Sequence, residues 1–281
     1  TRAGHGGRVT VLSTQSTSVG GTISARGGRA SGNGGTVELS GEAGFRLTGR
    51  ADTSAPHGAL GTVVLDPRDL TITATVAGSN RTRVSTVDPN IAADAGGTAT
   101  DAYVTPAQVQ QLTGNVRLQA TRDLTVASDL TYGGGSSLTL EAGRNLTVNA
   151  GVTLKVPVFQ SQYGFIPSVL TLTAAAAGIS GRDPAGTLQV LGNLLASGLA
   201  LAAGSGGIVL GGQLTTLPGT VNSIAFATTG SVTQTGGSLA TGNLTGNAAS
   251  LSLTQAANQV GGIGVAGAQF TTTLGGATVT T

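Results

Sequence analysis

Short stretches in which apolar and polar residues alternate recur along the whole chain. GGRVTVLS occupies 6–13, GGTVELSG occupies 34–41 and SLTLEAGRNLTVNAG occupies 137–151. Alternation with period two directs one set of side chains to a buried face and the other to water. The stretches return roughly every 20 to 25 residues, which is typical of a solenoid, because a stack of units buries the apolar face that one unit cannot. The pattern predicts an all-β rod that extends over 1–281 as a single domain.

The alternation stops between 78 and 112, where the chain is polar and contains proline. This irregular excursion includes the clearest helix signal of the sequence, over 106–112. Thr105 is suited to the N-cap, Pro106 to the first helical position, and Gln108 completes a capping box with Thr105. We expect this short helix to dock on the rod rather than to carry chemistry.

A second interruption covers 157–167 and lies between two prolines. It holds Phe159, Tyr163 and Phe165, three of the eight aromatic residues in the chain. A loop this rich in aromatic side chains either covers part of the core or binds a flat ligand such as a sugar ring. The three residues are the candidate ligand-binding loop.

Charge is distributed unevenly along the chain. Only 9% of the residues are charged, and none of them follows Asp183. A β surface without charge lacks the usual protection against association, so we expect a self-association surface in this part, with Thr233 and Thr254 as candidates. The net charge of +2 is too small to indicate a nucleic acid partner. The uncharged stretch 194–212 is interrupted by glycines, so we expect no membrane span.

The residues that usually bind metals are scarce. The chain has no Cys, and His5 and His57 stand apart from any acid at ligand spacing. We expect no metal site and no cofactor.

A polysaccharide-degrading β-helix enzyme would need two or three carboxylates that converge on one groove. Asp66 and Asp69 are the closest pair of candidates. The favoured interpretation is that both shape a corner of the coil, and that Arg122–Asp123 and Arg144–Asn145 occupy equivalent corner positions in successive coils. We therefore predict no catalytic residue and no enzymatic activity.

Three segments carry a resemblance to a known family. GTVVLDPRDLTIT at 61–73, YVTPAQVQQLTGNVRLQATRDLTVAS at 103–128 and GSVTQTGGSLATGNLTGNAASLSLTQAANQVGGIGV at 230–265 resemble the filamentous-haemagglutinin-like exoproteins of bacterial two-partner secretion. The resemblance implies a right-handed parallel β-helix. The secretion domain of that family carries Asn-Pro-Asn motifs, and the nearest match here is Asp88–Asn90. The resemblance therefore implies a stretch of the rod downstream of the secretion domain.

The resemblance also implies a function. Members of the family are exported by an outer-membrane two-partner transporter and act as adhesins or filaments at the bacterial surface. We expect a structural and adhesive rod segment, secreted or on the cell surface, that attaches to a glycan or protein receptor. The alternatives are a subunit that self-assembles into an extracellular fibre and, with less support, a polysaccharide-degrading enzyme.

Overall fold

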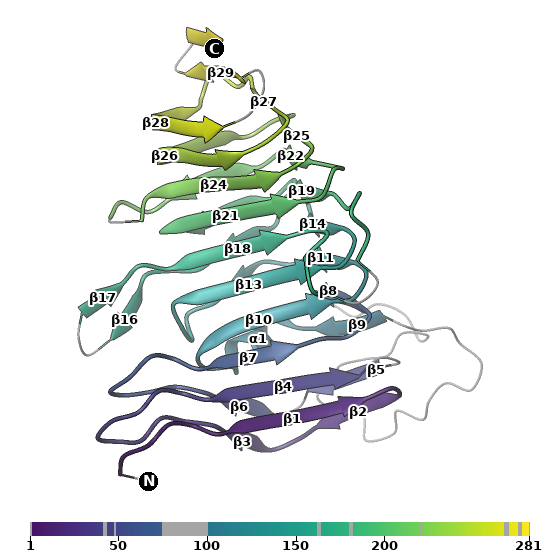
Figure 1. Ribbon diagram of the computed structural model, residues 1–281, viewed down its shortest axis with the longest axis vertical. Helices are drawn as coiled ribbons and strands as arrows, with labels where there is room; N and C mark the ends of the chain where they lie inside the picture. Colours follow the sequence, from purple (N-terminus) through teal and green to yellow (C-terminus); the bar gives the residue numbers. More distant parts are fainter. Residues whose placement is uncertain are drawn as a thin grey trace.

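The chain forms a stack of β coils (Figure 1). The computed structural model describes residues 2–41, 44–47, 49–74, 101–161, 164–179, 182–219, 221–266, 270–274 and 277–280. Nearly all of the strands in these ranges pair in parallel with the equivalent strand of the next coil. The predicted all-β parallel β-helix is confirmed. No helix in the described ranges is long and apolar enough to span a membrane.

The strands line three faces of the coil. The first face carries ten of the described strands: β1 (Arg8–Ser13), β4 (Thr36–Gly41), β7 (Thr62–Leu65), β10 (Asn115–Ala120), β13 (Ser137–Ala142), β18 (Val169–Thr173), β21 (Gly198–Ala203), β24 (Ser223–Thr228), β26 (Ser238–Asn247) and β28 (Gln259–Ala266). At about 4.8 Å per strand, this face is roughly 45 Å long.

The second face contains shorter strands, which in spatial order are β2 (Ser16–Val19), β5 (Gly44–Leu47), β9 (Asp101–Val104), β8 (Asp69–Ile72), β11 (Leu124–Val126), β14 (Leu146–Val148), β19 (Leu188–Val190), β22 (Ile208–Leu210), β25 (Ser231–Gln234), β27 (Ser250–Leu253), β29 (Phe270–Leu274) and β30 (Ala277–Thr280). Strand β30 pairs with β29 antiparallel. Strand β9 lies between β5 and β8, although β8 precedes it in the sequence.

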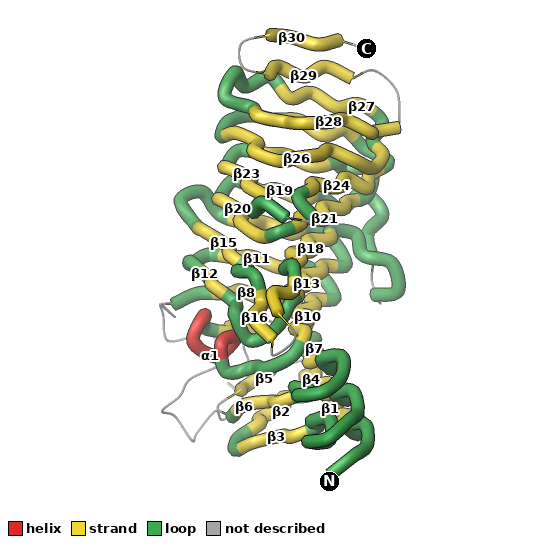
Figure 2. Tube along the Cα trace, turned by 90° about the vertical axis from the view of Figure 1, so that its left-hand side faces the viewer, coloured by secondary structure: helices red, strands yellow, loops and turns green. Residues whose placement is uncertain are grey.

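The third face is the shortest. It carries β3 (Thr22–Ser24), β6 (Arg50–Asp52), β12 (Leu130–Thr131), β15 (Thr153–Lys155), β20 (Asn193–Ala196) and β23 (Gln213–Thr216). Strands β26 and β28 begin on this face and bend onto the first one, so the first half of β26 pairs with β23 and its second half with β24. Figure 2 shows the resulting stack from the side.

The core consists of aliphatic columns that run along the rod. On the first face Val63, Val116, Leu138 and Leu170 stack in register, and all four are buried. A parallel column contains Leu140 and its neighbours on either side. Each side chain contacts its equivalents above and below, so dispersion contacts accumulate along the column.

The helix α1 (Pro106–Gln110) forms at the predicted place and ends two residues before the predicted boundary. The capping box is present, because the Thr105 side chain accepts a hydrogen bond from the N–H of Gln108 and the Gln108 side chain accepts one from the N–H of Thr105. The Gln108 Nε2 also donates to the carbonyl of Leu47 at 2.7 Å. Val109 and Leu112 are fully buried. The helix thus docks on the rod, as predicted; residues 78–100 of the excursion lie outside the described ranges.

We predict that Leu140→Ala lowers the free energy of unfolding by about 2–4 kcal/mol, because it leaves a cavity in a packed column. Thr139→Ala, on the adjacent outward position, is the matched control and should change it by less than about 0.5 kcal/mol. Urea unfolding followed by circular dichroism measures both. Equal effects of the two substitutions would contradict the assignment of the buried face.

Candidate functional site

The aromatic loop is an antiparallel hairpin formed by β16 (Phe159–Ser161) and β17 (Gly164–Ile166). It leaves the rod between β15 and β18, where the third face turns into the first, and projects away from the stack (Figure 1). The Phe165 side chain is 75% exposed and Ile166 is 39% exposed. Phe159 is half-buried, and Tyr163 lies outside the described residues. The hairpin therefore presents an apolar tip to solvent.

The base of the hairpin is held by two buried serines. Ser168 Oγ donates to the carbonyl of Val156 at 2.6 Å, which closes the hairpin at the surface of the coil. The N–H of Ser168 donates to Ser197 Oγ at 3.1 Å, and the N–H of Ser197 donates to Ser168 Oγ at 3.0 Å. Since both residues are at most 3% exposed, these bonds are shielded from water and fix the hairpin to the next coil.

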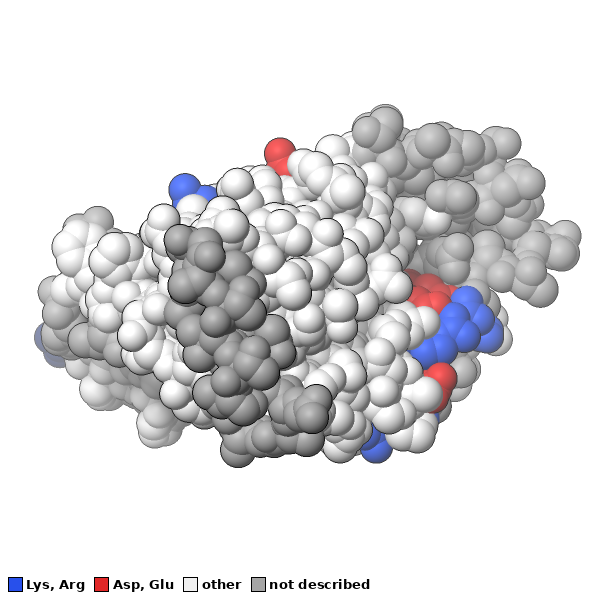
Figure 3. All heavy atoms as spheres, turned by 90° about the horizontal axis from the view of Figure 1, so that it is seen from above, with Lys and Arg blue, Asp and Glu red and all other residues white. Residues whose placement is uncertain are grey.

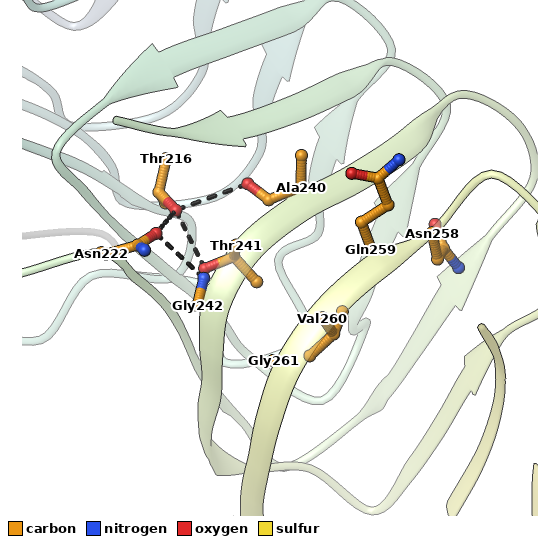
Figure 4. Close-up of a pocket in the computed structure, with 9 residues that line it drawn as sticks. All are labelled: Thr216, Asn222, Ala240, Thr241, Gly242, Asn258, Gln259, Val260 and Gly261. Atoms are coloured by element: carbon orange, nitrogen blue, oxygen red, sulfur yellow. Dashed lines mark hydrogen bonds between the residues drawn. The ribbon is translucent and has the colours of Figure 1, made fainter. Parts of the chain in front are cut away.

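The same corner forms a groove further along the rod, in the coils of β23, β26 and β28. We call the edge between the third and first faces the groove corner; it includes the hairpin base at Ser168 and the groove. The groove has a volume of about 630 Å³. Figure 4 shows the residues that line it. Its lining contains no charged residue: Thr216, Asn222, Ala240, Thr241, Gly242, Asn258, Gln259, Val260 and Gly261.

The groove was not predicted from the sequence. The available signals were the glycines at 242 and 261, where β26 and β28 change faces, and the Pro218-containing loop before β24. These signals lie in three coils, and only the stacking of the coils brings them together.

A cluster of charged residues lies at the opposite edge of the first face, where it meets the second. Asp69 Oδ1 accepts from the N–H of Asp123 at 3.1 Å, and Asp123 Oδ1 accepts from the N–H of Asn145 at 3.2 Å. Asn145 Oδ1 then accepts from the N–H of Thr187 at 3.0 Å. We call this the ladder corner. The predicted equivalence of Arg122–Asp123 and Arg144–Asn145 is confirmed, since Leu124 pairs with Leu146.

Arginines complete the ladder corner. The Arg122 guanidinium binds both carboxylate oxygens of Asp69, and the Arg144 guanidinium binds both oxygens of Asp123. Burial raises the pKa of Asp123, but the hydrogen bonds from Arg144 and from the N–H of Asn145 together hold the pKa below its usual value. Seen from the C-terminal end, most of the described surface is uncharged; the largest cluster of charged side chains lies on the right, and a few others are scattered around the rim (Figure 3).

The two candidate acids have different surroundings. Asp69 lies at the ladder corner with both oxygens bound to arginine, whereas Asp66 lies beside the outward positions of the first face. Within the described residues no group of three or more His, Cys, Asp and Glu side chains is arranged to hold a metal ion. His5 Nδ1 accepts a hydrogen bond from the N–H of Asn33.

The two candidate self-association residues lie on neighbouring coils. Thr233 is on β25 and Thr254 follows β27, which pairs with β25, and both are exposed. Thr233 belongs to an outward column of uncharged side chains on the second face, between Val209 and Ser252.

The fold and the two corners define the class of protein: a parallel β-helix repeat protein with a projecting hairpin and an uncharged groove. No protein-family model and no curated protein matched the sequence in comparison.

Asp66 offers a test of the electrostatics. Burial first, and the nearby charge of Glu38 second, raise its pKa, and its buried Oδ1 has no hydrogen-bond partner within the described residues. We predict that Asp66→Asn raises the free energy of unfolding at pH 7 by about 1 kcal/mol, because it removes a negative charge that burial and Glu38 both disfavour.

The stability difference between the Asp66→Asn variant and the parent chain should change with pH in one direction only. Because the pKa of Asp66 is higher in the folded chain than in the unfolded one, the charged form destabilises the fold. The advantage of Asp66→Asn should therefore be absent below the unfolded pKa near 3.8, grow as the pH rises through the folded pKa, and stay constant above it. A difference that shrinks with rising pH, in urea unfolding at several pH values, would contradict the assignment.

Proposed function

We propose that this chain is a structural and adhesive rod segment of a secreted bacterial surface exoprotein of the filamentous-haemagglutinin-like kind. The observation that carries the proposal is the hairpin β16–β17, whose exposed Phe165 projects from a rigid β-helix. Exposed apolar side chains that are held out by a stiff scaffold are typical of a contact surface. The resemblance of 61–73, 103–128 and 230–265 to that family supports the same function.

The contact would be made by few side chains. Complete burial of one Phe side chain contributes about 1.5–3 kcal/mol, which corresponds to a weak single contact. Attachment would then depend on many rods that bind at once, since linked weak contacts gain affinity from high effective concentration. A stiff rod suits this role, because it holds the hairpin at a constant distance from the surface that carries it.

Export and location are part of the proposal. By the family resemblance, an outer-membrane two-partner transporter would release the chain, which would act outside the cell or on its surface. The receptor would be a glycan or protein that accepts the ring of Phe165.

We predict that Phe165→Ser lowers the attachment of chain-coated beads to receptor-bearing cells at least tenfold, from the lost burial of the ring. The control is Leu12→Ser, which removes an apolar side chain that is 62% exposed on β1, far from the hairpin. Bead counts under flow, over a panel of bacterial and epithelial cells, measure the effect. If the parent beads attach and both variants attach equally well, the hairpin is not the contact.

The second candidate is a subunit of an extracellular fibre. It is favoured by the uncharged surface after Asp183 and by the exposed Thr233 and Thr254 on it. Sheet surfaces without charge associate readily, because no desolvation of ions opposes contact. The groove lining offers no titratable side chain and so gives no support to the enzyme alternative.

For the fibre we predict that Thr233→Lys combined with Thr254→Lys abolishes assemblies that the parent chain forms at high concentration, because like charges would meet at the contact. Thr14→Lys, at an exposed position in the charged half of the chain, is the control and should leave assembly unchanged. Negative-stain electron microscopy and sedimentation across a concentration series show the outcome. Filaments that persist in the double variant would exclude this surface as the contact.

A further inference from the structure

We propose that the groove at the groove corner binds a neutral, polyhydroxylated ligand, that is, an uncharged oligosaccharide. This inference goes beyond the adhesive function of the hairpin, because it assigns a second binding site that does not include Phe165. The construction of the groove, the polar atoms that line it and the absence of charged residues from its lining favour such a ligand.

The groove exists because successive coils pass this corner differently. Between β23 and β24 the described residues 217–219 and 221–222 belong to no strand, whereas β26 and β28 bend from the third face to the first within one continuous strand. The bends contain glycine for a steric reason. A Cβ on Gly242 would lie 2.7 Å from Asn222 Nδ2, and a Cβ on Gly261 would lie 2.6 Å from the carbonyl oxygen of Gly242. At Gly242 and Gly261 the groove is therefore lined by bare backbone, and Asn222 lines it from the segment before β24.

One wall is a preformed hydrogen-bond network. Thr216 Oγ1 donates to Asn222 Oδ1 and lies 3.0 Å from Thr241 Oγ1, and Asn222 Oδ1 also accepts from the N–H of Gly242 at 2.9 Å (Figure 4). Thr216 is 6% exposed, so the network does not rearrange freely with water. The Asn222 Nδ2 donor has no hydrogen bond to another described residue. It lies directly over Gly242, and both residues line the groove.

The wall formed by the start of β28 is fixed by the hydrogen bonds of Asn258. Asn258 is 1% exposed and exchanges two hydrogen bonds with Gln234, at 3.0 and 2.8 Å, while its Oδ1 also accepts from the N–H of Leu239 at 3.0 Å. This fixes the start of β28, where the adjacent Gln259 is exposed. The Gln259 amide supplies a donor and an acceptor on a rigid base.

These atoms select the ligand by charge. Amide and hydroxyl groups exchange hydrogen bonds with sugar hydroxyls at little net cost, whereas an anionic ligand would lose hydration with no cation nearby to replace it. The chain has no Lys, Arg or His after Asp183, so no cation lies among the lining residues. The volume of about 630 Å³ lies within the usual range of ligand pockets, about 300–1,000 Å³.

Two variants test the site. Asn222→Asp keeps the oxygen that accepts from Thr216 and Gly242, but replaces the free amide donor by a negative oxygen. Ala240→Phe fills the groove from β26, on the outward position between Thr215 and Gln259. Gln213→Glu is the matched control, because it adds the same charge at an exposed position of β23 that does not line the groove.

The probes are neutral tetrasaccharides of glucose, mannose, galactose and xylose, with tetragalacturonate and sialyllactose as acidic counterparts. Isothermal titration and ligand-observed NMR with the whole chain, at up to about 10 mM probe, measure binding. We expect at least one neutral probe to bind and the acidic probes to bind at least tenfold more weakly. Asn222→Asp and Ala240→Phe should each weaken binding at least tenfold, and Gln213→Glu should not change it.

The proposal is overturned if no neutral probe binds, if an acidic probe binds better, or if binding is unchanged in both groove variants. Thermal unfolding shows whether each groove variant folds. If one of the two does not fold, the other tests whether the groove binds the ligand. Phe165→Ser separates this site from the hairpin: it should retain oligosaccharide binding even where it abolishes the attachment of beads. Loss of oligosaccharide binding in Phe165→Ser would assign the sugar to the hairpin and overturn the groove.

Discussion

The in-register parallel pairing of successive coils is the constraint on which the rest of the structure depends. Each strand forms its backbone hydrogen bonds with the equivalent strand of the next coil, so equivalent side chains are about 4.8 Å apart along the rod. Val63, Val116 and Leu138 are therefore direct neighbours in space although they are far apart in sequence. The same geometry stacks polar side chains at the corners. There the backbone turns between faces, and its N–H and C=O groups need hydrogen-bond partners.

The two corners of the first face satisfy these backbone groups in different ways. At the ladder corner, Asp69, Asp123 and Asn145 each accept the N–H of the next coil, and arginines neutralise the carboxylates. At the groove corner, uncharged side chains such as Ser168 and Asn222 satisfy the backbone: Ser168 Oγ donates to the carbonyl of Val156, and Asn222 Oδ1 accepts from the N–H of Gly242. A neutral corner tolerates insertions and bends, because a change in the path of one coil leaves no ion unpaired.

Much of the fold could be predicted because the determining patterns are local. Alternation identified the buried side of segments such as 115–120, and the capping box located the helix through Thr105 and Gln108. The stacking of Asp123 on Asn145 followed from the repeat itself. The position of β9 between β5 and β8 could not be predicted, because the sequence of a strand does not specify which strand it pairs with after a long excursion.

The candidate sites show the same limit. The interruption at 157–167 was predicted, but its projection from the rod was not, because its antiparallel hairpin depends on the pairing of Phe159 with Ile166 across residues whose alternation is weak. The groove depends on bends in two coils and a loop in a third, and each is an ordinary glycine or proline signal alone. A repeat protein acquires a site where consecutive coils differ. Departures from the repeat, rather than the repeat itself, are therefore the places at which to search such a chain for function.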